Sequence, residues 1–99
     1  MSCPAPLKAM ALAAALVLTA LPAAAQCYAD FRVRDRNWDI RFGVSQVPNT
    51  ACGDTSAAHR HIEPRVQRDG WILLDVLSTF GPEGLETRRA NAGDLFLRY

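Results

Sequence analysis

The residues best suited to chemistry form one short cluster, with a separate carboxylate further along the chain. His59, His61 and Glu63 occupy one segment, and Asp75 lies between two apolar residues. If the segment is helical, His59 and Glu63 share a face, whereas His61 points away by about half a turn. A zinc site needs three or four convergent ligands. We therefore predict solvated histidines with a surface ion pair, and no bound metal.

Asp75 is open to two interpretations. A carboxylate on a mostly apolar face is either a functional acid with a raised pKa or a group that pairs with an arginine or meets solvent, and we favour the second. The serines lack nucleophile-elbow glycines, and no glycine-rich phosphate loop is present. We predict no enzyme, no catalytic residue and no cofactor. The alternative is a small-ligand or metal-binding enzyme component that uses His59, Glu63 and Asp75.

Residues 1–25 have the layout of a secretory signal peptide. A lysine precedes an apolar run over residues 9–21, and a proline then precedes three alanines. The run is too short for a membrane anchor, which needs about 20 residues. We predict cleavage between Ala25 and Gln26, a secreted and periplasmic protein, and no membrane span once the signal is removed.

The predicted mature domain, residues 26–99, is neutral and has two cysteines. Without Lys8 the chain carries ten arginines and ten acidic residues. A neutral chain lacks the basic excess on which nucleic-acid binding depends, so we predict no nucleic-acid partner. Cys27 and Cys52 are expected to form a disulfide in an oxidising compartment, because a redox pair needs a short spacing such as C-x-x-C.

The domain that must position these side chains is predicted to be α+β. Alternating apolar residues indicate four strands of a small antiparallel sheet, and an apolar residue at every fourth position indicates one main helix on one face. The strands cover 28–34, 38–47, 71–80 and 94–99, and the helix covers 55–69. A tight turn at 35–37 joins the first two strands. Pro64 is expected either to kink the helix or to split it.

The strand over residues 71–80 is apolar on both faces, which is typical of a central or covered strand. The face expected under the helix carries Ile72, Leu74, Val76, Ser78 and Phe80. The other face carries Trp71, Leu73 and Leu77, with Asp75 and Thr79. We predict that Trp71, Leu73 and Leu77 contact a protein partner or a second copy of the chain.

The segment 81–93 is long for an unstructured connection in so small a domain. Pro82 near its start and Gly93 at its end favour a short helix over an extended hairpin arm, although Gly84 weakens such a helix. Both alternatives leave 94–99 as the last strand of the sheet.

Two motifs in the second half of the domain are Gly70-Trp71-Ile72-Leu73-Leu74-Asp75-Val76-Leu77 and Leu95-Phe96-Leu97-Arg98-Tyr99. With the helix before them, they resemble a family of very small α+β domains of unknown function, built from a helix, a Gly-Trp strand and a final strand. The mature chain, from Cys27-Tyr28-Ala29-Asp30 onward, is also similar to short secreted bacterial proteins of unassigned function. The resemblance implies a fold and transfers no catalytic residue.

The absence of a catalytic set and the two-faced strand together predict a non-catalytic interaction or structural module. Its partner would be another protein or a second copy of the chain. An inhibitor of a hydrolase is a further alternative, because it fits the small size and the disulfide.

Overall fold

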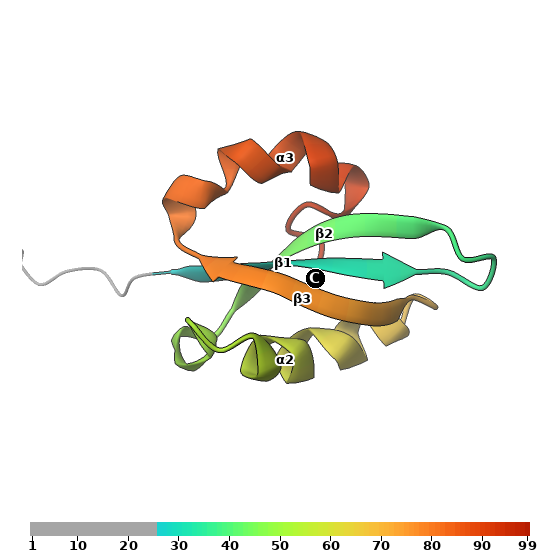
Figure 1. Cartoon of the computed structure of the whole chain (residues 1–99), viewed down its shortest axis with the longest axis horizontal. Coiled ribbons are helices and arrows are strands. Elements are labelled where there is room, and N and C mark those ends of the chain that lie inside the picture. The colour runs from blue at the N-terminus through green and yellow to red at the C-terminus, as the bar shows by residue number, and fades with distance from the viewer. Residues whose placement is uncertain (1–25) are drawn as a thin grey trace, which may run out of the picture.

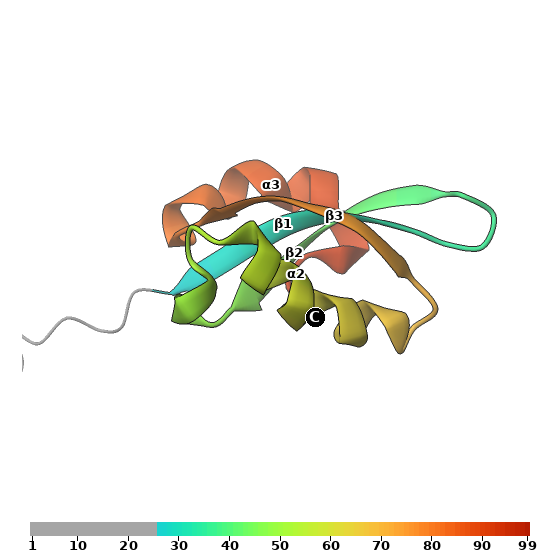
Figure 2. The ribbon, with the colours of Figure 1, turned by 60° about the horizontal axis from the view of Figure 1, so that its bottom comes forward.

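The computed structural model describes residues 26–99, which form a sheet with helices on both sides (Figure 1, Figure 2). The elements are β1 (Cys27–Arg34), β2 (Ile40–Val47), α2 (Thr55–Gln67), β3 (Ile72–Phe80) and α3 (Glu86–Ala92). Short 3-10 turns occupy Asn49–Ala51, Pro82–Gly84 and Gly93–Leu95. The predicted α+β class is confirmed. The predicted signal peptide lies outside the described residues.

The sheet is antiparallel and has the strand order β2-β1-β3. β1 is the central strand, and its side chains alternate between the two faces of the sheet. Ala29, Phe31 and Val33 are fully buried on one face, and Asp30 and Arg32 lie on the other. β3 is an edge strand whose hydrogen-bonded neighbour is β1. Its two apolar faces therefore reflect coverage by helices and not a central place in the sheet.

The helix α2 packs on one face of the sheet through a single apolar stripe. Ala58, Ile62 and Val66 recur at every fourth position, and all three are fully buried. They join Phe31 and Val33 of β1 in the main core cluster. A stripe with this spacing faces one side of a helix, so the sequence predicted the orientation of α2 as well as its existence.

Pro64 lies inside α2 without dividing it into two helices. Its ring removes the amide that would have bonded the carbonyl of Arg60. The guanidinium of Arg65 donates a hydrogen bond from Nη1 to the carbonyl of His61 at 2.6 Å, which gives the disturbed turn another donor. Pro64 itself is exposed. Of the two outcomes predicted for this residue, the split helix is not found.

A second helix, α3, covers the opposite face of the sheet (Figure 1). Ala92 of α3 packs with Tyr28 and Val44 in a smaller cluster that includes the half-buried Phe80. The segment 81–93 therefore forms the helical alternative. The expectation of one main helix on one face is corrected to helices on both faces.

The predicted strand 94–99 is wrong. After α3 the chain makes a 3-10 turn and touches β2 through a single parallel bridge between Val44 and Phe96. The Leu97 amide donates to the Val44 carbonyl at 2.8 Å. Leu97 then adopts a φ of +57°, which leaves the extended conformation. The sheet consequently has three strands in place of the predicted four.

The predicted disulfide between Cys27 and Cys52 is present, with the two Cα atoms 5.8 Å apart. Cys27 starts β1 opposite Val47, the last residue of β2. Cys52 follows the 3-10 turn after β2. The bridge therefore closes the open end of the β1–β2 hairpin.

Candidate functional site

The most unusual surface of the domain is the part of the sheet that α3 leaves uncovered. Strand pairing places Ile40, Arg34 and Ile72 side by side across β2, β1 and β3. The hairpin of β1 and β2 extends well beyond α3 (Figure 1). We call the surface formed by Arg34, Trp38, Ile40, Phe42 and Ile72 the open sheet face.

Large apolar side chains on the open sheet face are exposed to solvent. The exposed fractions are 63% for Trp38, 48% for Ile40 and 41% for Ile72. Single exposed apolar residues are normal, but a group around one end of a sheet marks a surface suited to contact. The sequence does not reveal this group, because the alternation of apolar residues places Trp38 and Ile40 on one face of a single predicted strand, 38–47.

The hairpin loop holds Trp38 in a fixed position. Asp35 accepts hydrogen bonds at Oδ1 from the amides of Asn37 and Asp39, at 2.8 and 2.9 Å. The guanidinium of Arg34 lies over the Trp38 ring, 3.9 Å from its centroid. Trp38 has a φ of +65°, so it belongs to the loop, and β2 begins at Ile40 instead of at the predicted residue 38.

Asp75 forms a two-pronged ion pair with Arg32, next to the open sheet face. Arg32 donates from Nε to Oδ1 at 2.9 Å and from Nη2 to Oδ2 at 2.7 Å. The hydrogen bonds from Arg32 lower the pKa of Asp75, against a smaller opposing effect of burial. The interpretation of Asp75 as a paired carboxylate is confirmed. Its lowered pKa is unsuited to a proton donor at neutral pH.

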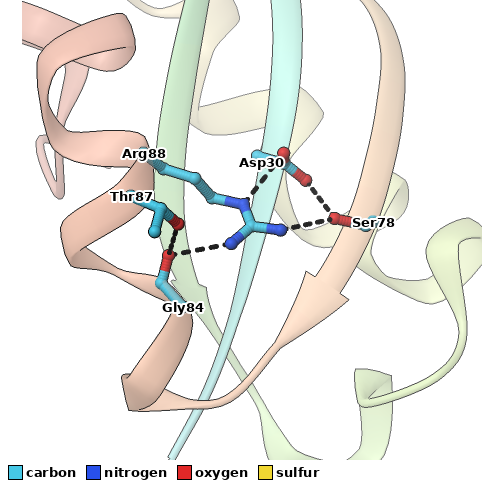
Figure 3. Close-up of polar contacts among 5 residues, drawn as sticks. All are labelled: Asp30, Ser78, Gly84, Thr87 and Arg88. Carbon is cyan, nitrogen blue, oxygen red and sulfur yellow. Dashed lines mark hydrogen bonds and ion pairs between the residues drawn. The ribbon is translucent and has the colours of Figure 1, made fainter.

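A polar network fastens α3 to the sheet (Figure 3). Asp30 accepts hydrogen bonds from the Ser78 hydroxyl at 2.6 Å and from Arg88 Nε at 3.1 Å. Arg88 also donates from Nη1 to the Gly84 carbonyl at 2.8 Å. Asp30 and Arg88 are 58 residues apart, and the sequence contained no signal that could pair them.

The histidine cluster forms only its predicted helix-surface pair. His59 Nε2 lies 3.3 Å from Glu63 Oε2. Burial, and then the neighbouring Arg65, lower the pKa of His61, which is not part of this pair. His59 and Asp75 line one pocket of about 370 Å³ beside β3. Among residues 26–99, no three His, Cys, Asp or Glu side chains gather as a metal site would require.

Trp71, Leu73 and Leu77 do not form the single contact face predicted for them. Leu73 is only 6% exposed and belongs to the main core, and Trp71 packs against the same cluster. Leu77 is exposed and lines a small crevice next to Arg88 of α3.

Two bulges explain this error. The β1–β3 register shifts between Asp30 and Phe31, where Leu77 is the additional residue, and again between Arg32 and Val33, where Leu74 is additional. Each additional residue reverses which side chains face the helix. Strict alternation along 71–80 therefore assigns Leu73 to the wrong face.

No protein-family model, curated protein or solved structure matches this chain. The helices in the described part of the chain are all too short or too polar to cross a membrane.

Proposed function

We propose that this chain is a secreted, periplasmic module without catalytic activity, and that its open sheet face binds another protein. The observation that carries the proposal is Trp38, a large apolar residue that is 63% exposed and held in a left-handed backbone conformation. An exposed tryptophan ring and a left-handed backbone both disfavour the folded state, so the stability of the domain does not explain them.

The energetics of Trp38 favour a role in contact over a role in stability. A left-handed backbone costs a residue other than glycine about 1–2 kcal/mol. An exposed cation–π contact such as that with Arg34 returns only about 0.5–1 kcal/mol. Asparagine or glycine would occupy this loop position at lower cost. Backbone strain of this kind is typical of functional sites.

The surroundings of Trp38 also suit a protein partner. Tryptophan and arginine are the residues that most often dominate binding energy at interfaces. Here they are already stacked, and the Asp35 hydrogen bonds hold the loop, so little side-chain freedom remains to be lost on binding. Ile40 and Ile72 flank Arg34 and would bury apolar area against a partner.

The proposal is tested by photo-crosslinking from the open sheet face. A photoreactive residue replaces Trp38 in one variant and Thr50 in a control, since Thr50 is exposed in the 3-10 turn after β2. We expect a discrete adduct in periplasmic extract from position 38 and none from position 50. Unlabelled wild-type chain should compete for that adduct, whereas a chain with Ile40→Ser and Ile72→Ser should not.

Light scattering of the purified chain separates the two kinds of partner. A mass that rises with concentration identifies the partner as a second copy, and a constant monomer mass with a competable adduct identifies a different protein. A monomer that gives no adduct, or the same adducts from both positions, contradicts the proposal.

A further inference from the structure

A second surface, on the α2 side of the sheet, gathers arginines at the end of α2. Arg65 and Arg68 of the helix terminus, Asp69, and Arg98 and Tyr99 of the last segment line one pocket of about 340 Å³. We call it the arginine pocket. Its lining comes from two stretches of chain about 30 residues apart, so the fold, and not the sequence spacing, assembles it.

The arginine pocket has a local excess of positive charge in a neutral domain. Its side chains comprise three guanidinium groups and one carboxylate. Elsewhere three arginines are paired one to one, Arg32 with Asp75, Arg88 with Asp30 and Arg89 with Glu86. Four others, Arg34, Arg36, Arg41 and Arg60, form no ion pair within residues 26–99, but none of them lines this pocket. Arg68 forms no ion pair within residues 26–99. An excess of one sign in a concave site attracts ligands of the other sign.

The single side-chain carboxylate, that of Asp69, links Tyr99 and Arg98 and leaves most guanidinium N–H donors of the pocket unused. Asp69 accepts a hydrogen bond at Oδ2 from the Tyr99 hydroxyl at 2.6 Å, and Arg98 Nε lies 3.8 Å from the same oxygen. Arg98 and Arg65 each present five N–H donors. Their contacts in the domain, with Asp69 and with the His61 carbonyl, use only part of that capacity.

The segment 97–99 is anchored to β2 so that it lies beside the end of α2. The buried Ser45 hydroxyl donates to the main-chain oxygen of Tyr99 at 2.6 Å, which directs that oxygen toward β2. Leu97 has a φ of +57° and a half-exposed side chain, so the strained backbone is not explained by burial. The reversal at Leu97 brings Arg98 and Tyr99 to the end of α2.

Helix capping does not explain the Arg68 side chain. Cationic side chains commonly bond the last carbonyls of a helix. Here the Val66 carbonyl accepts from the amides of Asp69 and Trp71, and the Gln67 carbonyl accepts from the amide of Gly70. The main chain therefore already satisfies these carbonyls, and the Arg68 side chain is free for another partner.

The geometry points to a binding site for a phosphate group, held by Arg65, Arg68 and Arg98. A guanidinium fork matches two oxygens of a tetrahedral oxyanion, and several forks around one pocket favour a group with more than two oxygens, such as a phosphate, over chloride or a carboxylate. The phosphate belongs either to a soluble ligand or to the headgroup of an anionic lipid. This inference is independent of the proposed function, because the open sheet face shares no residue with the pocket.

The test compares two variants of equal charge. The first carries Arg68→Gln and Arg98→Gln in the pocket. The control carries Arg36→Gln and Arg60→Gln, which lie at the hairpin loop and on α2 and are exposed. Inorganic phosphate is titrated at constant ionic strength against chloride, and the side-chain Nε–H resonances of the arginines are followed by NMR. In parallel, phosphatidylglycerol vesicles and phosphatidylcholine vesicles are sedimented with each protein.

In the wild type we expect the arginine Nε–H resonances to shift saturably with phosphate, or the protein to sediment with phosphatidylglycerol vesicles and not with phosphatidylcholine vesicles. The pocket variant should bind at least about tenfold more weakly, because two charge-assisted contacts are lost, and the control should retain wild-type affinity. Phosphate binding without vesicle binding identifies a soluble ligand, and vesicle binding identifies a headgroup. Failure to bind either probe, or equal losses in both variants, overturns the inference. Equal urea midpoints confirm that both variants fold.

Discussion

At the scale of single residues, the chemistry of a side chain depends on partners that are distant in the sequence. Asp75 has apolar neighbours and resembled a possible acid, but Arg32, 43 residues away, neutralises it. The sequence predicted the pairing of Asp75 without naming its partner, because that choice depends on the register of β3. The sequence also missed Trp38 as a surface residue, since its φ is set by the loop.

The Arg32–Asp75 pair makes the stability of the domain depend on pH. Arg32 lowers the pKa of Asp75 in the folded state, so the unfolded state takes up a proton first as the pH falls. The ion pair therefore contributes its full stabilisation above the pKa of an aspartate in the unfolded chain, about 3.9. This contribution is lost as the pH falls from there through the lower pKa of Asp75 in the folded state. We expect Asp75→Asn to lower the urea midpoint at pH 7 and to have little effect at pH 2.

The control for this prediction is Asp94→Asn, because Asp94 is exposed and forms no ion pair within the described segment. Its midpoint should follow that of the wild type across the pH range. A difference between Asp75→Asn and wild type that does not change with pH would show that the ion pair is not its source.

Trp38 gives a second prediction at the scale of one residue. Replacement by asparagine, which tolerates a left-handed φ, should leave the free energy of unfolding unchanged or raise it by up to about 1 kcal/mol. Trp71→Asn is the comparison, since Trp71 packs against the core and its loss should destabilise the domain. Urea unfolding measures both. A loss of more than about 1 kcal/mol for Trp38→Asn would exceed the contact with Arg34 and give Trp38 a structural role.

At the scale of secondary structure, elements with uninterrupted periodicity were predicted well. β1, β2 and α2 lie within two residues of their predicted ranges at each end, because buried residues recur in each of them with the spacing of a strand or of a helix. β3 was found but its faces were misassigned, since bulges leave no mark in the sequence. Residues 94–99 alternate like a strand, yet the chain approaches β2 from α3 and keeps only one bridge.

Gly43 shows how tightly β1 and β2 pack. It lies opposite Phe31, and a Cβ at this position would overlap the Phe31 ring. We expect Gly43→Ala to cost about 1–3 kcal/mol, which is typical of adding a methyl group to a filled core. The smaller side chain of Phe31→Leu should make room for that methyl group.

A double-mutant cycle therefore tests the contact between positions 31 and 43. The combined variant should be more stable than the sum of the two single effects predicts, by about 0.5–3 kcal/mol. Additive losses would mean that the methyl group added at position 43 conflicts with a group other than the Phe31 ring. Urea unfolding of the four proteins provides all of the required free energies.

At the scale of the whole molecule, the domain has three layers but too little helix to cover both faces of its sheet. A sheet of three strands has a helix on each face, but α3 has only seven residues and covers one end (Figure 1). The open sheet face is a direct consequence of that short helix. Its residues could not be predicted, because the sequence does not show which part of a sheet a following helix will cover.

So small a domain should depend strongly on its disulfide. Closing a loop of 25 residues in the unfolded chain stabilises the folded state by about 3.5 kcal/mol in the chain-entropy model. A domain of this length has roughly 4–11 kcal/mol in total, at 0.05–0.15 kcal/mol per residue. We expect reduction of the wild type, and Cys27→Ala with Cys52→Ala, to lower the free energy of unfolding by similar amounts. Agreement assigns the loss to the bridge, because reduction leaves no cavity at the buried Cys27. A loss below about 1 kcal/mol in urea unfolding would contradict the chain-entropy estimate and show that the bridge contributes little to stability.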